Sequence, residues 1–227
     1  MAGFSFAKNQ NGGTPTRQPL LIVYNTAIEK GEIVGFTPGT GVVAVTAANY
    51  AGPAIGVADE AHDGSTAGRQ VGTEIFVITN PDAIFALNST NIITATSGST
   101  TTFVVSGLLP QTNNLWTGGM LYIIACAADS TLNGKMIPIT GSTGSSGTLT
   151  VATQTGVFAS GDTAYLCPGP AAITEHAWDL ASDGDDVDWD SDGAFGLQLV
   201  GSAPKKMISY WSLRGHYFGN SVIALVA

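Results

Sequence analysis

The residues best able to do chemistry are acids gathered in one run near the C-terminal end. Eight of the 17 Asp and Glu residues lie between positions 175 and 192. The D-x-D-x-D-G opening of a calcium-binding loop is matched by Asp188, Asp190, Asp192 and Gly193. Like charges packed this closely are electrostatically unfavourable without a cation. The run therefore predicts an Asx-rich turn that binds calcium, with Asp186, Asp188, Asp190 and Asp192 as its ligands.

The calcium pattern is incomplete, which keeps a second interpretation open. An EF-hand places a bidentate Glu at its twelfth position, where this chain has Leu199, and no helical pattern flanks the loop. A solvated acidic loop without a metal has the same sequence signature. No other cofactor is expected.

Patterns of catalytic residues are missing elsewhere. There is no G-x-S-x-G elbow and no H-E-x-x-H motif, and the three histidines (His62, His176 and His216) are isolated in the sequence. Acids at 59, 60 and 63 could supply a glycosidase pair, but the segment has the composition of a solvated turn. The chain is therefore expected not to be an enzyme.

Composition excludes two further classes. Net charge is −9 and only Lys135 is basic between Arg69 and Lys205, so there is no basic stripe for nucleic acid. No apolar run is long enough for a membrane-spanning helix and no secretory signal is visible, so we expect a soluble chain made in a cytoplasm. Charged residues make up only 11%, which suits large surfaces that pack in an assembly. Cys126 and Cys167 lie in apolar contexts and are expected to be buried free thiols.

Short β-type runs dominate the chain, and helical periodicity is almost absent. Runs at 32–37, 42–46, 54–59, 74–79 and 83–87 predict a small barrel or curled sheet. From about residue 88 the chain becomes rich in Ser, Thr and Gly, with further strands expected at 101–106, 120–127, 135–140, 148–153 and 163–167. The tail adds expected strands at 195–200, 206–213 and 221–227. The expected fold class is all-β: a small barrel-like unit plus a second β unit, a barrel or sandwich.

The domain organisation follows from these changes in composition. Residues 20–87 together with 171–227 are expected to form a barrel-like base, and residues 88–170 an inserted or second β domain. Residues 1–19 have the composition of an extended arm that cannot build a core alone and would be disordered in a monomer. In an assembly this arm would lie across a neighbour, with Phe4, Phe6 and Arg17 as its contact residues.

The N-terminal unit, at about 26–87, resembles the capsid decoration proteins of tailed bacteriophages, also called head-stabilising or cement proteins. The resemblance rests on Gly31–Val34, on the I-G-V-A stretch of Ile55–Ala61, and on Val71–Ile78. Segments of the 88–170 unit, such as Trp116–Leu121, are similar to a β unit of phage virion proteins.

The resemblance implies a structural role in a virion. Members bind the lattice of the major capsid protein on the outer capsid surface and stabilise it as homo-oligomers, typically homotrimers, with no catalytic residues to carry over. Two alternatives share the same composition: a tail, fibre or head–tail joining component, and a carbohydrate-binding β module that would use Trp116, Trp178, Trp189 or Trp211 as a sugar platform.

Overall fold

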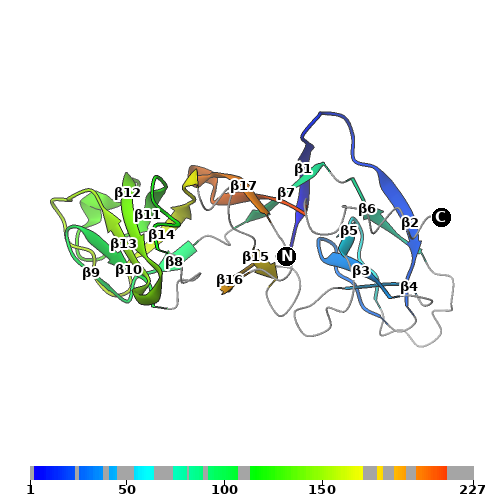
Figure 1. Ribbon diagram of the computed structural model, residues 1–227, viewed down its shortest axis with the longest axis horizontal. Helices are drawn as coiled ribbons and strands as arrows, with labels where there is room; N and C mark the ends of the chain where they lie inside the picture. The colour runs from blue at the N-terminus through cyan, green and yellow to red at the C-terminus, as the bar shows by residue number, and fades with distance from the viewer. Residues whose placement is uncertain are drawn as a thin grey trace.

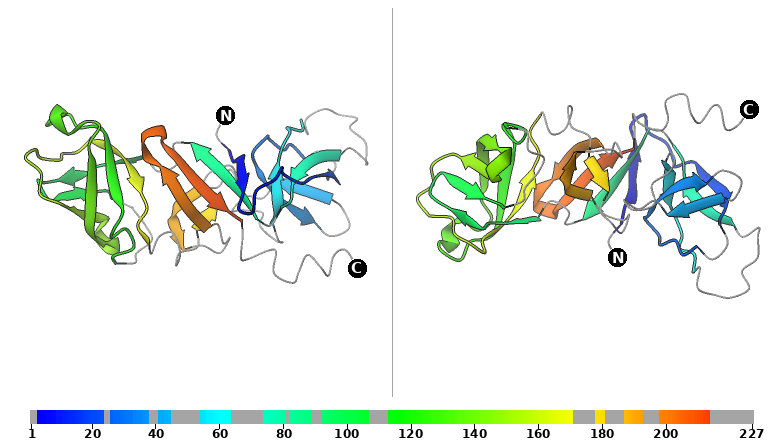
Figure 2. Two further views of the ribbon diagram at one scale, coloured as in Figure 1. Left: turned by 90° about the horizontal axis from the view of Figure 1, so that it is seen from above. Right: turned by 60° about the horizontal axis from the view of Figure 1, so that its bottom comes forward.

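The computed structural model describes residues 3–23, 26–37, 41–44, 54–63, 74–80, 82–88, 92–106, 113–170, 178–180, 187–192 and 198–213. Most of the described strands form three bodies in a row: a small barrel at one end, an open sheet in the middle and a larger barrel at the other end (Figures 1 and 2). Two further strands form a separate two-stranded sheet. The prediction of an all-β fold is confirmed. None of the described helical turns is long and apolar enough to cross a membrane.

The small barrel is a five-stranded antiparallel sheet whose two edges meet. Its order is β2-β6-β5-β3-β4, with β2 (Arg17–Leu21), β3 (Ile33–Thr37), β4 (Gly41–Ala44), β5 (Ala54–Ala58) and β6 (Glu74–Ile78). A parallel bridge between Ile22 and Val42 joins the end of β2 to β4, and the Val23 amide donates to the Val42 carbonyl at 3.1 Å. Side chains alternate across a strand, so one set fills the barrel: Ile22, Ile28, Val34, Val42, Ala58, Ile75 and Val77.

The middle body is an open four-stranded sheet that joins distant parts of the chain. Its order is β1-β7-β18-β17, with β1 (Ser5–Asn9), β7 (Ala83–Asn88), β17 (Gln198–Ala203) and β18 (Ile208–Ser212). One face buries Phe85, Leu87 and Trp211 in a core that continues into the larger barrel. This core also includes Ile33, Val57 and Ile78 of the small barrel, which do not belong to the set that fills that barrel. The Trp211 indole donates to the Ser209 hydroxyl at 2.7 Å, and this hydroxyl donates to the Leu87 carbonyl at 3.3 Å. These bonds satisfy the indole and the Ser209 hydroxyl, whereas the buried Asn9 Oδ1 of β1 has no hydrogen-bond partner among the described residues.

The larger barrel is built entirely from residues 92–167. Its seven strands, in the order β8-β14-β11-β12-β13-β10-β9, are β8 (Ile92–Thr94), β9 (Ser97–Gly98), β10 (Thr102–Val104), β11 (Met120–Ala125), β12 (Met136–Thr143), β13 (Thr148–Val151) and β14 (Thr163–Cys167). Strands β8 and β9 follow one another directly, one pairing with β14 and the other with β10. This bent segment closes the sheet on itself, so no long edge is left open.

A buried carboxylate inside the larger barrel is held by hydrogen bonds. Asp162 is fully buried, and its carboxylate accepts from the amides of Ala127 and Ala159, each at 2.8 Å, and from the Cys126 thiol at 3.1 Å. Burial raises the pKa of the Cys126 thiol, and its hydrogen bond to Asp162 raises it further. Cys126 and Cys167 are both buried and free, as predicted. The short 3-10 helices η1 (Ser130–Leu132) and η2 (Gly144–Ser146) connect strands of this barrel, and η3 (Pro204–Lys206) connects β17 to β18.

The acidic run is a strand where a turn was expected. Residues of β16 (Val187–Asp192) pair antiparallel with β15 (Trp178–Leu180), and Asp188 lies opposite Asp179. The expectation of an Asx-rich turn is therefore wrong for Asp188, Asp190 and Asp192. Asp186, the fourth expected calcium ligand, lies outside the described residues, as does the expected strand at 221–227.

The N-terminal segment is part of two sheets, so the expectation of a disordered arm is wrong. Strand β1 pairs with β7, from Ser5 opposite Ala86 to Asn9 opposite Ala83, and β2 pairs with β6 along its whole length. The composition of the segment is poor for an independent core. A strand does not need its own core if it can hydrogen-bond to the edge of an existing sheet. Strand β1 pairs in this way with β7, and β2 pairs with β6.

Candidate contact surface on the small barrel

The three short motifs that carry the family resemblance become three neighbouring strands. Gly31–Val34 leads into β3, Ile55–Ala61 contains most of β5, and the described part of Val71–Ile78 is β6. Strand β5 lies between β3 and β6 in the sheet, with Val57 opposite both Ile33 and Ile78. The motifs therefore specify one continuous face of the small barrel.

The glycines in these motifs are required by close backbone approach. A Cβ atom on Gly56 would lie 2.2 Å from the Ile78 carbonyl oxygen, and one on Gly31 would lie 2.9 Å from the Phe4 carbonyl oxygen. Gly31 also has a φ of +95°, which L side chains rarely adopt. Both positions allow strands to approach closely, so the motifs describe how this barrel packs and contain no catalytic group.

Of the two aromatic residues predicted as contact residues of the arm, Phe4 is buried and Phe6 is partly buried. Phe4 is only 3% exposed, and its amide donates to the Gly31 carbonyl at 2.9 Å. Phe6 packs on the same core with its ring edge-on to Phe85, at 6.5 Å between centroids. Phe4 is therefore not available to an external partner. These aromatic residues fasten β1 between the small barrel and the middle sheet.

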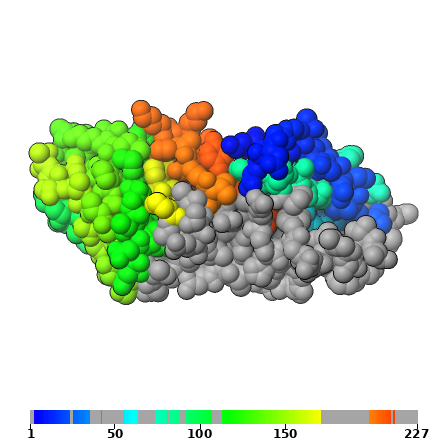
Figure 3. Space-filling model, turned by 45° about the horizontal axis from the view of Figure 1, so that its top comes forward, coloured from blue at the N-terminus to red at the C-terminus, as the bar shows by residue number. Residues whose placement is uncertain are grey.

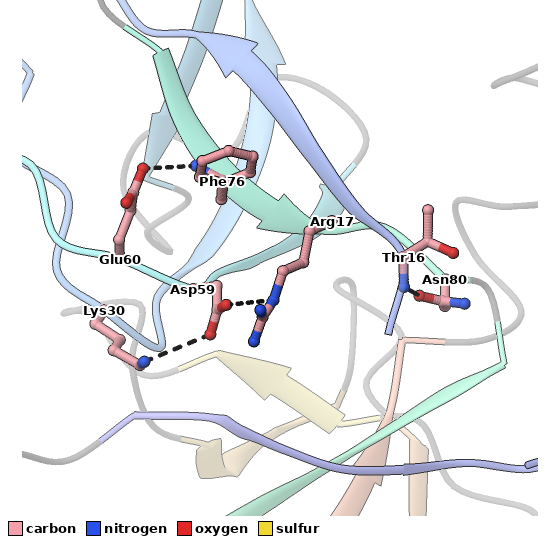
Figure 4. Close-up of polar contacts among 7 residues, drawn as sticks. All are labelled: Thr16, Arg17, Lys30, Asp59, Glu60, Phe76 and Asn80. Carbon is pink, nitrogen blue, oxygen red and sulfur yellow. Dashed lines mark hydrogen bonds and ion pairs between the residues drawn. The ribbon is translucent and has the colours of Figure 1, made fainter. Parts of the chain in front are cut away.

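Arg17, the third predicted contact residue, lies at the surface in an ion-pair cluster. Its Nε atom lies 2.7 Å from one oxygen of Asp59, and the Lys30 ammonium lies 3.4 Å from the other. Figure 4 shows the Asp59 carboxylate between the two basic side chains. Both bases are more than half exposed, so each pair adds at most about 1 kcal/mol to stability. The cluster leaves most of the Arg17 and Lys30 donors facing solvent.

Next to Arg17, the outer face of the small barrel carries an exposed apolar patch. Pro19 lies opposite Phe76 and Leu21 opposite Glu74, and an antiparallel pair presents such side chains on one face. Leu21 is 51% exposed and Phe76 is 46% exposed. We call Pro19, Leu21 and Phe76 the β2–β6 patch. Glu60 borders it, because its carboxylate accepts from the Phe76 amide at 2.8 Å (Figure 4).

A pocket of about 250 Å³ lies on the other side of Arg17, between the small barrel and β1. It is lined by Phe4, Ser5, Phe6, Pro15, Arg17, Lys30, Val57, Ala58, Asp59 and Ile78. The patch, the ion-pair cluster and the pocket are thus neighbours on the surface of the small barrel, with the ion-pair cluster between the other two. The result is a surface with an apolar part and a part of mixed charge, and the described residues that form it include no nucleophile paired with a base.

The other chemically suggestive residues are engaged in structure. Asp59 is ion-paired and Glu60 bonds to backbone, so the two are not an unengaged glycosidase pair. His62 is buried, and its backbone bonds to that of Ile28 in both directions. Within the described residues, no three His, Cys, Asp or Glu side chains come together as a metal site. Trp116 and Trp211 are buried and cannot stack on a sugar.

Comparison with known proteins adds no relative. No protein-family model matches the chain, and no curated protein or solved structure is significantly similar to it.

Proposed function

We propose that this chain is a non-enzymatic structural protein of a virion that decorates a bacteriophage capsid and stabilises its lattice. One observation carries the proposal. The three motifs that resemble those of decoration proteins form neighbouring strands and make up one face of the small barrel. A protein of this kind works by binding. Many modest apolar and main-chain contacts act together, and they stabilise only the assembled shell.

The β2–β6 patch is the surface that we assign to the major capsid protein. Exposed apolar side chains surrounded by charges of both signs favour a protein surface that presents apolar groups with a mixed-charge border. Phe76 supplies an aromatic anchor of the type found at the centre of interfaces. Arg17 and Lys30 at its border would guide the approach of acidic residues on the lattice.

The number of copies per particle tests the role. Quantitative mass spectrometry of purified particles compares this chain with the most abundant shell protein. A ratio near one to one supports lattice-wide decoration. A few copies per particle would instead identify a tail, fibre or joining component, and no copies at all would remove the virion role.

A pair of variants tests the assigned surface. Phe76→Ser should reduce binding to shells that lack the chain by at least about tenfold, since an interface anchor typically contributes 2 kcal/mol or more. Val157→Ser is the matched control, because Val157 is 48% exposed but belongs to the larger barrel. Equal binding of the two variants would show that the β2–β6 patch does not contact the shell.

A further inference from the structure

Two β-hairpins in different bodies of the molecule have the same register and turn geometry, and their equivalent residues are 60 positions apart in the sequence. The first is β12–η2–β13 in the larger barrel, and the second is β17–η3–β18 in the middle sheet. In the first, Ile139 pairs with Val151 and the register then shifts before Gly141. In the second, Leu199 pairs with Trp211 and the register shifts before Gly201. The bulge occurs at the same point in both.

The turns of the two hairpins match as well. Each consists of a three-residue 3-10 helix followed by one residue in the left-handed conformation: Gly147, with a φ of 59°, and Met207, with a φ of 53°. After the turn, Thr148 pairs with Thr143 and Ile208 with Ala203. The second hairpin therefore repeats the first, strand for strand.

The hairpins differ in what lies at their outer edge. In the larger barrel, β11 pairs with the outer edge of β12, from Met120 opposite Pro138 to Tyr122 opposite Met136. In the middle sheet, β17 is the last strand, and within the described residues its ladder is made with β18 alone. Figure 3 shows residues of β17 and η3 forming a raised part of the surface between the larger barrel and the N-terminal strands. Among the residues that the structure describes, no strand occupies the position beside β17 that β11 occupies beside β12.

Strand β17 has a bulge at Val200 but lacks two other features that protect an edge from pairing. Its sequence, Gln-Leu-Val-Gly-Ser-Ala, contains no charge and no proline. The opposite edge of the same sheet, β1, also has a bulge and in addition carries Lys8, whose charge discourages pairing. Both barrels are closed, as described above. Of the two edges of the middle sheet, β17 is therefore the one suited to receive another strand.

We propose that β17 of one copy pairs antiparallel with β17 of a second copy, joining the two middle sheets into one continuous sheet. A twofold pair suits this strand because it has no charges that would face their own copies across the axis. The net charge of −9 arises elsewhere in the chain, so an uncharged edge is where two copies can approach most closely. The inference is independent of the proposed virion role, and it predicts a dimer, unlike the homotrimer that the family resemblance implies.

Sedimentation equilibrium of the full-length chain and of two variants tests the pairing. The wild type should have the mass of a dimer. Val200→Glu introduces a charge in the centre of β17, where two copies would place like charges together, and should raise the dimer dissociation constant by at least about tenfold. Thr140→Glu is the matched control, since Thr140 is exposed at the equivalent position of β12, whose edge is already occupied. It should leave the dimer intact.

Hydrogen exchange locates the effect on the edge itself. Amides of residues 198–203 should exchange more slowly in the wild type than in Val200→Glu, while the amides of β18 stay equally protected and show that the sheet is folded. A monomeric wild type, a wild-type trimer, or a Val200→Glu dimer as tight as the wild type would each overturn the proposal.

Discussion

Replacing Gly31 by Ala tests whether the resemblance motifs encode packing of the N-terminal segment. The added Cβ atom would lie 2.9 Å from the Phe4 carbonyl oxygen and 3.1 Å from its amide nitrogen. Gly13 offers the matched control: its φ of +92° is close to the +95° of Gly31, but a Cβ atom added to Gly13 would meet nothing within 4 Å. The two substitutions therefore share the same backbone strain and differ in contact with Phe4.

The expected magnitudes follow from those two contributions. Left-handed strain costs about 1–2 kcal/mol, and the stiffer unfolded chain returns about 0.4–1, so Gly13→Ala should destabilise by about 1 kcal/mol. Crowding against the Phe4 backbone adds about 1–3 kcal/mol for Gly31→Ala. The difference between the variants should therefore be about 2 kcal/mol, or roughly 4–8 °C in melting temperature for a chain of this size.

Thermal and denaturant unfolding followed by circular dichroism measures this difference. Limited proteolysis provides a second measurement, since displacement of Phe4 would expose the first residues to cleavage in Gly31→Ala but not in Gly13→Ala. If the two variants agree within about 0.5 kcal/mol, the usual error of such comparisons, the contact with Phe4 does not stabilise the fold and the structural interpretation of the motif fails.

Two further predictions concern the N-terminal strands and the buried thiols. Deleting residues 1–18 removes β1 and the start of β2, so both the middle sheet and the small barrel should lose stability; an unchanged melting temperature would contradict their role in the sheets. Burial raises the pKa of the Cys167 thiol from 9.0 to about 11, so the unfolded chain loses this proton first and stability should fall as pH rises from 9 through 11. Cys167→Ala should flatten that part of the stability curve, and a profile identical to the wild type would exclude Cys167 as its source.

Most strands could be predicted because their side chains have a clear alternation or an unbroken β-branched run. Expected runs at 32–37, 74–79 and 163–167 coincide closely with β3, β6 and β14. Such segments bury one or both faces, so their apolar residues are visible in the sequence itself. Three strands that escaped prediction, β8, β9 and β15, have only two or three residues each, too few to show a period. The longer strands β1, β2 and β16 were missed because their polar composition is typical of loops.

The contact residues of the N-terminal segment were predicted less well because burial there depends on distant partners. Phe4 looks exposed among Asn, Gly and Pro residues, yet Gly31 and the core of the middle sheet enclose it. Conversely, Phe76 and Leu21 lie in ordinary strand patterns, and only the pairing of β2 with β6 reveals that both face outward. The available signal was an apolar residue at the solvent position of an alternating strand, in the pattern Glu-Ile-Phe-Val of β6.

The repeated hairpin shows why a structural repeat can leave almost no trace in sequence. Over the two hairpins, the shared feature in residue type is the Gly-Ser pair at the bulge, Gly141-Ser142 and Gly201-Ser202. Ser142 accepts from the Trp116 amide at 3.2 Å, whereas the Ser202 hydroxyl bonds to Cys167. Even the left-handed position differs, since Met207 stands where the first hairpin has Gly147. Register and turn geometry are properties of the backbone, and many different side chains are compatible with them. The similarity of the two hairpins, and the difference between the outer edges of β12 and β17, can therefore be recognised only when the strand pairing is known.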